Sequence, residues 1–149
     1  MKTHNHSCTT YFAFQFEIDF AKNAELLRHS LECEPEQIGI YNKTEAEQAI
    51  VAALGVKPTF NRHYFEIGHN EAYSVYVSDM VRVTLKDLIG KEQAIVELKR
   101  RFNLSTCLEI VPYIAADSDE PNQCLSLDDD IIEFLYKTGT SMDLDYYII

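Results

Sequence analysis

Hydrophobic and polar residues alternate strictly over residues 11–18, and this is the best-defined pattern in the chain. Phe12, Phe14, Phe16 and Ile18 occupy every second position, and more polar or smaller residues lie between them. Successive side chains of a β-strand point to opposite faces of its sheet. The alternation therefore predicts a strand with one buried and one solvated face.

Three stretches in the middle of the chain have the composition of strands. Residues 63–67 and 73–77 are separated by a glycine-containing segment, residues 68–71, that suits a β-hairpin. Residues 104–115 form a longer run rich in apolar and β-branched side chains. We therefore predict a hairpin followed, after a helix, by a long strand.

Helical spacing of apolar residues predicts a helix that starts at a capping box, Thr44-Glu45-Ala46-Glu47. Gly55 suits its left-handed end, and Pro58 prevents the helix from resuming. Three more helices are expected: a short one capped by Asn23, one over residues 84–102 interrupted at Gly90, and a final one capped by Ser126 and closed by Gly139.

The last residues alternate again and predict a terminal strand. Leu144, Tyr146 and Ile148 fall on one face of it, and Asp143, Asp145 and Tyr147 fall on the other.

This order of elements predicts an α+β fold, with a single mixed, largely antiparallel sheet and helices mainly on one face. A ferredoxin-like kernel with additions is one arrangement that satisfies the order. The 149 residues match one domain, residues 1–149, with a mobile N-terminal tail over residues 1–8.

The net charge of −11 is spread unevenly. From residue 103 onward, Lys137 is the one basic residue among many aspartates and glutamates. Such a field repels phosphate backbones, so we expect no binding to nucleic acid, and it favours a basic protein partner or a cation. The binding residues that we predict are Asp128, Asp129, Asp143, Asp145 and Tyr147.

No apolar run approaches the roughly 20 residues that a membrane span requires, and the N-terminus has no apolar signal core. The four cysteines lack metal-binding spacing and suit reduced thiols. We therefore expect a cytoplasmic protein without a membrane segment.

Local motifs for catalysis or for a resident metal are missing from the sequence. It contains no nucleophile elbow, no glycine-rich phosphate loop and no pair of histidines at zinc-binding spacing. Residues 117–121 lack the central glycine of a calcium loop. We therefore predict neither a cofactor nor a catalytic residue, although catalytic groups can also converge from distant positions.

The C-terminal third carries Leu125-Ser126-Leu127 at the start of a helix, Ile132-Glu133-Phe134-Leu135 within it, Gly139, and the Asp143-Leu144-Asp145-Tyr146-Tyr147 strand. Through these motifs the chain resembles the DUF4279 family of small bacterial proteins of unknown function. The opening strand over residues 11–18 and the segment over residues 54–59 are also similar. This resemblance implies an α+β protein and brings no reaction or catalytic residue with it.

These observations lead to three hypotheses. The first is a non-catalytic protein-binding domain, similar to an immunity or adaptor protein, with an acidic surface. The alternative is a small-molecule or divalent-metal-dependent enzyme that uses Asp143 and Asp145 together with a distant histidine such as His63. The third is a subunit of a homo-oligomer.

Overall fold

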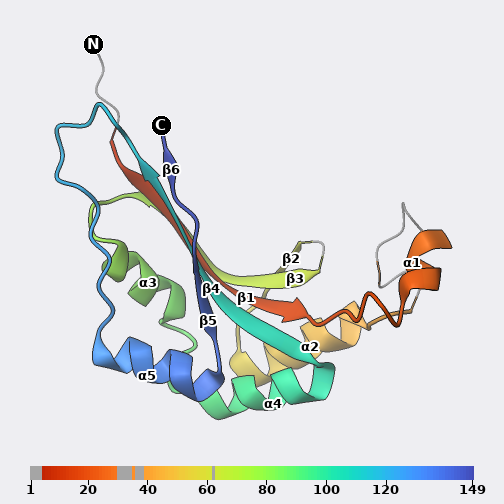
Figure 1. Cartoon of the computed structure of the whole chain (residues 1–149). Helices are drawn as coiled ribbons and strands as arrows, with labels where there is room; N and C mark the ends of the chain where they lie inside the picture. Colours follow the sequence, from red (N-terminus) through yellow and green to blue (C-terminus); the bar gives the residue numbers. More distant parts are fainter. Residues whose placement is uncertain (1–4, 30–34, 36–38, 62) are drawn as a thin grey trace.

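The computed structural model describes residues 5–29, 35, 39–61 and 63–149 (Figure 1). Its strands are β1 (Ser7–Phe16), β2 (Thr59–Asn61), β3 (Tyr64–Tyr73), β4 (Leu104–Ile114), β5 (Ser141–Leu144) and β6 (Tyr147–Ile148). Its helices are α1 (Ala24–His29), α2 (Lys43–Leu54), α3 (Val77–Leu85), α4 (Glu92–Phe102) and α5 (Asp129–Thr138).

The strands form one mixed sheet in the order β2-β3-β1-β4-β5, and β6 also pairs with β4. The pairs β2–β3, β3–β1 and β1–β4 are antiparallel, and β5 and β6 run parallel to β4. The predicted α+β class and the largely antiparallel sheet are confirmed. The connection β1-α1-α2-β2-β3-α3-α4-β4 in this strand order is compatible with a ferredoxin-like kernel, to which α1, α5, β5 and β6 are added.

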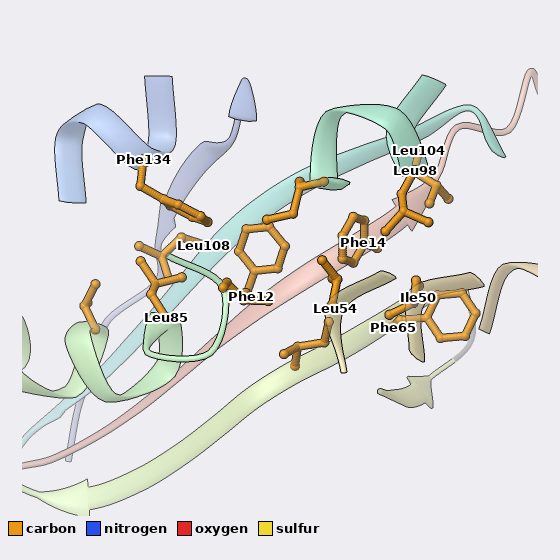
Figure 2. Packing of buried hydrophobic residues seen from close by; sticks show 14 of the residues in the cluster. Phe12, Phe14, Ile50, Leu54, Phe65, Leu85, Leu98, Leu104, Leu108 and Phe134 are labelled. Atoms are coloured by element: carbon orange, nitrogen blue, oxygen red, sulfur yellow. The ribbon is translucent and has the colours of Figure 1, made fainter. Parts of the chain in front are cut away.

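One face of the sheet is covered by α2, α3, α4 and α5 (Figure 1). The core lies between this layer and the sheet, where Phe12 and Phe14 of β1 are fully buried among side chains of the helices (Figure 2). Burying one such phenylalanine stabilises the fold by about 1.5–3 kcal/mol. The predicted alternation of β1 is therefore confirmed, although the strand starts earlier, at Ser7, and ends at Phe16.

The predicted hairpin over residues 63–77 is wrong, because β3 runs through residues 68–71 without turning. The register with β1 shifts between Thr10 and Phe12, so that Gly68 and His69 lie opposite the single residue Tyr11. Gly68 has a φ of 67°. A glycine in this left-handed conformation at the first position of an extra residue is a β-bulge, not a turn.

The bulge is fastened to α3 by a buried threonine. Thr84 Oγ1 donates a hydrogen bond to Gly68 O at 2.8 Å and lies 2.7 Å from Thr10 Oγ1. A Cβ atom at position 68 would lie 2.3 Å from Thr84 O, so the backbone of α3 leaves no room for a side chain there. This packing keeps the bulge at one place along β3.

Several other boundaries differ from the predictions. The structure adds the short strand β2 before β3, and residues 73–77 lead into α3, which begins at Val77 instead of residue 84. The predicted interruption at Gly90 is confirmed, since α3 and α4 are separate helices and Gly90 has a φ of 94°.

The glycines that end α2 and α5 are confirmed, and Asn23 directly precedes α1 as predicted, whereas the N-terminal caps of α2 and α5 are corrected. Gly55 and Gly139 adopt the left-handed conformation after α2 and α5. The cap of α2 is Asn42 instead of Thr44, because Asn42 Oδ1 accepts a hydrogen bond from the Glu45 amide at 3.0 Å. Asp128 precedes α5 in place of Ser126.

The predicted mobile tail over residues 1–8 is wrong for its last residues, which are part of the sheet or are buried beside it. Ser7 and Cys8 belong to β1, and Cys8 is fully buried. His6 is buried as well, and its Nδ1 accepts a hydrogen bond from the Ala115 amide at 3.0 Å. Within the described ranges, every helix is too short or too polar to cross a bilayer.

Candidate binding surface on the open face of the sheet

The face of the sheet opposite to α2, α3, α4 and α5, which we call the open face, carries polar and aromatic side chains that are only half-buried. The strand registers bring side chains of β3, β1, β4 and β5 into rows across this face. One row consists of His69, Tyr11, Glu109 and Asp143. An antiparallel sheet with one solvated face is stable if its other face is packed, as it is here.

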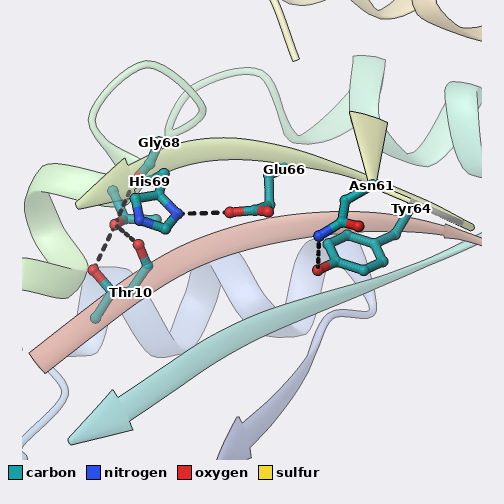
Figure 3. A network of polar contacts seen from close by, with 7 residues as sticks. Thr10, Asn61, Tyr64, Glu66, Gly68 and His69 are labelled. Carbon is teal, nitrogen blue, oxygen red and sulfur yellow. Dashed lines mark hydrogen bonds and ion pairs between the residues drawn. The ribbon is translucent and has the colours of Figure 1, made fainter. Parts of the chain in front are cut away.

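Two tyrosines and a histidine, which we call the aromatic stack, lie along the β1–β3 side of the open face. The ring of Tyr11 is 6.1 Å from that of Tyr64 and 5.9 Å from that of His69, with interplanar angles of 10° and 8°. Offset parallel rings at these distances attract each other by about 0.5–1.5 kcal/mol. Asn61 Nδ2 donates a hydrogen bond to Tyr64 Oη at 3.0 Å and fixes that end of the stack (Figure 3).

The bulge at Gly68 positions His69 at the other end of the stack (Figure 3). His69 Nδ1 lies 2.6 Å from Glu66 Oε1, and the side chain of Glu66 is only 13% exposed. Burial, followed by the hydrogen bond with Tyr64 and the nearby carboxylates, raises the pKa of Tyr11. Tyr11 therefore stays a neutral phenol at physiological pH.

Three carboxylates, which we call the acidic edge, lie on the β4–β5 side of the open face: Glu109, Asp143 and Asp145. Glu109 pairs with Asp143 across the parallel strands. Partial burial of Glu109, together with the negative charges of Asp143 and Asp145, raises its pKa. Cys107 Sγ lies 3.5 Å from Glu109 Oε1 and donates a weak hydrogen bond to it. This edge therefore concentrates negative charge that repels itself.

Two tyrosines border the acidic edge. The rings of Tyr113 and Tyr147 are stacked at 5.4 Å with an interplanar angle of 17°. Tyr147 Oη donates a hydrogen bond to Asp145 Oδ2 at 3.0 Å, which raises the pKa of Tyr147. The predicted residues Asp143, Asp145 and Tyr147 thus come together on one face, as their alternation in the sequence indicated.

The other two predicted residues lie elsewhere. Asp128 and Asp129 are at the N-terminus of α5, in the helix layer. Asp128 and Asp130 both bind Arg82 of α3, and this ion pair lowers the pKa of Asp130. The pair joins α3 to α5, so Asp128 has a structural partner within the chain. Asp129 lies in the first helical turn, where the helix dipole favours a carboxylate.

The geometry does not bring together the residues of the enzymatic alternative. His63 lies between β2 and β3, and β1 and β4 separate β3 from β5, where Asp143 is located. Within the described ranges, no three histidine, cysteine, aspartate or glutamate side chains lie together in a way that could hold a metal ion.

A groove of about 710 Å³ lies in the helix layer, away from the open face. Alanines of α2 and α4 line it, together with Leu98, Glu97, Arg100 and Arg101. Arg100 binds Glu97, and Arg101 binds Glu45 of α2. Both arginines beside this groove are therefore already engaged in ion pairs, one within α4 and one between α4 and α2.

Some residues of the open face were not predicted from the sequence. Glu109 shares the face of Tyr113 in the β4 alternation, and this period of two could have placed it. His69 and Glu66 could not be found in that way, because the predicted hairpin interrupted the strand on which they lie.

The chain matches no protein-family model, and comparisons with curated proteins and with solved structures find no significant match. The resemblance to the DUF4279 family therefore stays an expectation based on the residues themselves.

Proposed function

We propose that this chain is a non-catalytic protein-binding domain, similar to an immunity or adaptor protein, which recognises a basic partner through the acidic edge. One observation carries the proposal. Ion pairs in the described part of the chain involve other residues, and none of them includes Glu109, Asp143 or Asp145. These ion pairs join two helices or two residues of one element, whereas the carboxylates of the acidic edge stay available to a partner.

Electrostatics support this partner class. Burial and like charges raise the pKa of Glu109, so its ionised form costs free energy in the isolated chain. A lysine or arginine placed over Glu109 and Asp143 would relieve this cost. Single exposed ion pairs contribute about 0.2–1 kcal/mol, so several must act together, and their main effect is on specificity and on the association rate.

The tyrosines around the acidic edge support a protein as partner. Tyr113 and Tyr147 are held by stacking, so little conformational entropy is lost when they contact another surface. Tyrosine is enriched at protein interfaces because it contributes apolar area together with a hydrogen-bonding hydroxyl.

We place this binding in the cytoplasm. The described cysteines Cys8, Cys107 and Cys124 are free thiols, which are typical of a reducing compartment.

The test is affinity capture from the native host with the wild-type chain and two double variants, at about 50 mM and about 300 mM salt. Asp143→Asn with Asp145→Asn should lose a specific basic partner. Asp79→Asn with Asp129→Asn removes the same charge from α3 and α5, in the helix layer, and should retain it. A partner that is captured equally by both variants, or indifferently to salt, would contradict the proposal.

A further inference from the structure

The strand β5 is at an edge of the sheet. It pairs with β4, and the strand order ends with it for the residues that the structure describes. The Asp145 amide donates to Ile110 O of β4 at 3.0 Å. The amide and carbonyl groups of one residue point to the same side of a strand, and this side alternates along it. Met142 and Leu144 therefore direct their backbone groups away from β4, toward solvent.

The side chains on the two faces of this edge differ in chemistry. Asp143 and Asp145 lie on the open face. Leu144 and Tyr146 lie on the opposite face, where they are 47% and 60% exposed. They border a small cavity of about 150 Å³, whose other walls come from Val77, Pro112, Ile114, Gln123, Cys124 and Leu125. An acidic row and an apolar row therefore run along β5 and the two residues that follow it, one on each face.

The edge has few of the features that normally prevent pairing with another strand. Natural edge strands carry lysine or proline, which discourage such pairing. Residues 141–149 contain neither. The opposite edge, β2, has three residues, whereas β5 and β6 together continue the edge beside β4 over residues 141–148.

We propose that the free edge of β5 accepts an extended segment of the partner protein as an added strand, in which basic and apolar residues alternate. The basic side chains would lie over Asp143 and Asp145, and the apolar ones over Leu144, Tyr146 and the small cavity. This inference rests on the proposed function and names how the basic partner is held: main-chain hydrogen bonds bind it, and the two rows select its sequence.

A second copy of the chain fits this edge poorly. Pairing of two β5 strands around a two-fold axis places the same face of both strands on one side of the joined sheet. Asp143 and Asp145 of both copies would then face one another, and like charges opposite each other across a strand pair are destabilising. Charge complementarity therefore favours a basic segment over a second copy.

The first test uses a synthetic peptide of about eight residues in which lysine and valine alternate. It is compared with two isomers in which alternate backbone nitrogens are methylated. One isomer is methylated on the amides of its lysines and the other on those of its valines, so only one of them blocks the edge that faces β5. We expect the affinities of the isomers to differ by roughly tenfold or more, since main-chain hydrogen bonds are lost in one alone. Equal affinities, or no binding by the unmethylated peptide, would overturn the strand addition.

A pair of variants tests the same point on the protein. Leu144→Pro removes the outward amide and spares the bonds to β4, whereas Leu144→Ala removes a similar apolar contact and keeps the amide. Leu144→Pro should weaken peptide binding at least about tenfold relative to Leu144→Ala. If the two variants bind the peptide with equal affinity while Leu144→Pro is folded, the edge does not add a partner strand. The same conclusion follows if the wild type and Leu144→Ala form dimers and Leu144→Pro does not, because the edge then pairs with a second copy of the chain.

The outcomes separate this inference from the proposed function. Binding that is weakened by salt and by Asp143→Asn with Asp145→Asn, but is equal for the two methylated isomers, would leave the basic partner in place and overturn the strand addition. An edge-dependent peptide complex that ignores salt and both aspartates would contradict the proposed function instead.

Discussion

The two faces of β1 differ although one backbone forms both. Phe12 and Phe14 point into the core and are fully buried, whereas Tyr11 points to the open face and contacts Tyr64 and His69. The buried face is apolar and is explained by packing against the helices. The open face instead combines stacked aromatic rings with carboxylates that repel each other, an arrangement that packing does not require.

The largest difference in stability between the two faces of β1 is expected when neighbouring residues, one on each face, are truncated to alanine. Phe12→Ala should lower the free energy of unfolding by about 3–5 kcal/mol, because it leaves a cavity in the core. Tyr11→Ala should cost only about 1 kcal/mol, since it removes stacking on a solvated face. Chemical denaturation measures both. Similar losses for the two variants would contradict the assignment of the faces.

The next largest effect is expected at the bulge of β3, which contacts α3 on the buried face of the sheet and positions His69 on the open face. Gly68→Ala places a Cβ atom against the Thr84 backbone, so we expect a loss of about 3 kcal/mol or more. Gly55→Ala is the matched control, because Gly55 has a φ of 69° and open space around it. That variant should lose only about 1 kcal/mol. Equal losses in urea denaturation would mean that the backbone conformation alone, and not the contact with α3, fixes the bulge.

The hydroxyl of Thr84 should have a smaller effect. Thr84→Val keeps the volume of the side chain and removes its hydrogen bond to Gly68 O. We expect a loss of about 1–2 kcal/mol, because the partly buried carbonyl of Gly68 is left without this donor. A thermal denaturation curve that is unchanged by Thr84→Val would show that the hydroxyl does not hold the bulge.

The smallest change in stability is expected at Glu109, where substitution should stabilise the fold and not destabilise it. Its pKa in the folded chain lies above the ordinary value of 4.5, so the folded state holds the proton more tightly than the unfolded state. Its contribution to stability therefore falls as the pH rises from about 4.5 through the raised pKa. Glu109→Gln should raise stability at neutral pH by about 0.5 kcal/mol and flatten this dependence.

Asp130 provides the contrast in the helix layer. Arg82 lowers the pKa of Asp130, so that carboxylate stabilises the fold above its ordinary pKa and the contribution is lost as the pH falls. Asp130→Asn should therefore lower stability at neutral pH, whereas Glu109→Gln raises it. Unfolding measured at several pH values checks both signs, and the same sign for the two variants would contradict the electrostatic description of the open face.

The sequence predicted those parts of the fold that depend on local periodicity. The alternation in β1 and in the terminal segment correctly assigned Phe12, Phe14, Asp143 and Tyr147 to their faces. Gly68 misled the prediction, because a glycine at positive φ is typical of a turn and also of a bulge, and only the contact with Thr84 distinguishes them here.

The sequence predicted only part of the candidate site, because composition does not show which partner a carboxylate has in the fold. Acidic composition alone could not separate Asp143 and Asp145, which face solvent, from Asp128, which binds Arg82 across the helix layer. The role of Glu109 depends on the parallel register that brings it opposite Asp143, and strand register is a long-range property.

The most direct test of the central claim is a titration of isotope-labelled protein with the alternating lysine–valine peptide, followed by NMR of the backbone amides. We predict that the largest shifts fall on residues 107–113 and 141–148, which carry the acidic edge, and that they shrink in Asp143→Asn with Asp145→Asn. Shifts centred on α5 around Asp129, or on the groove between α2 and α4, would contradict the account.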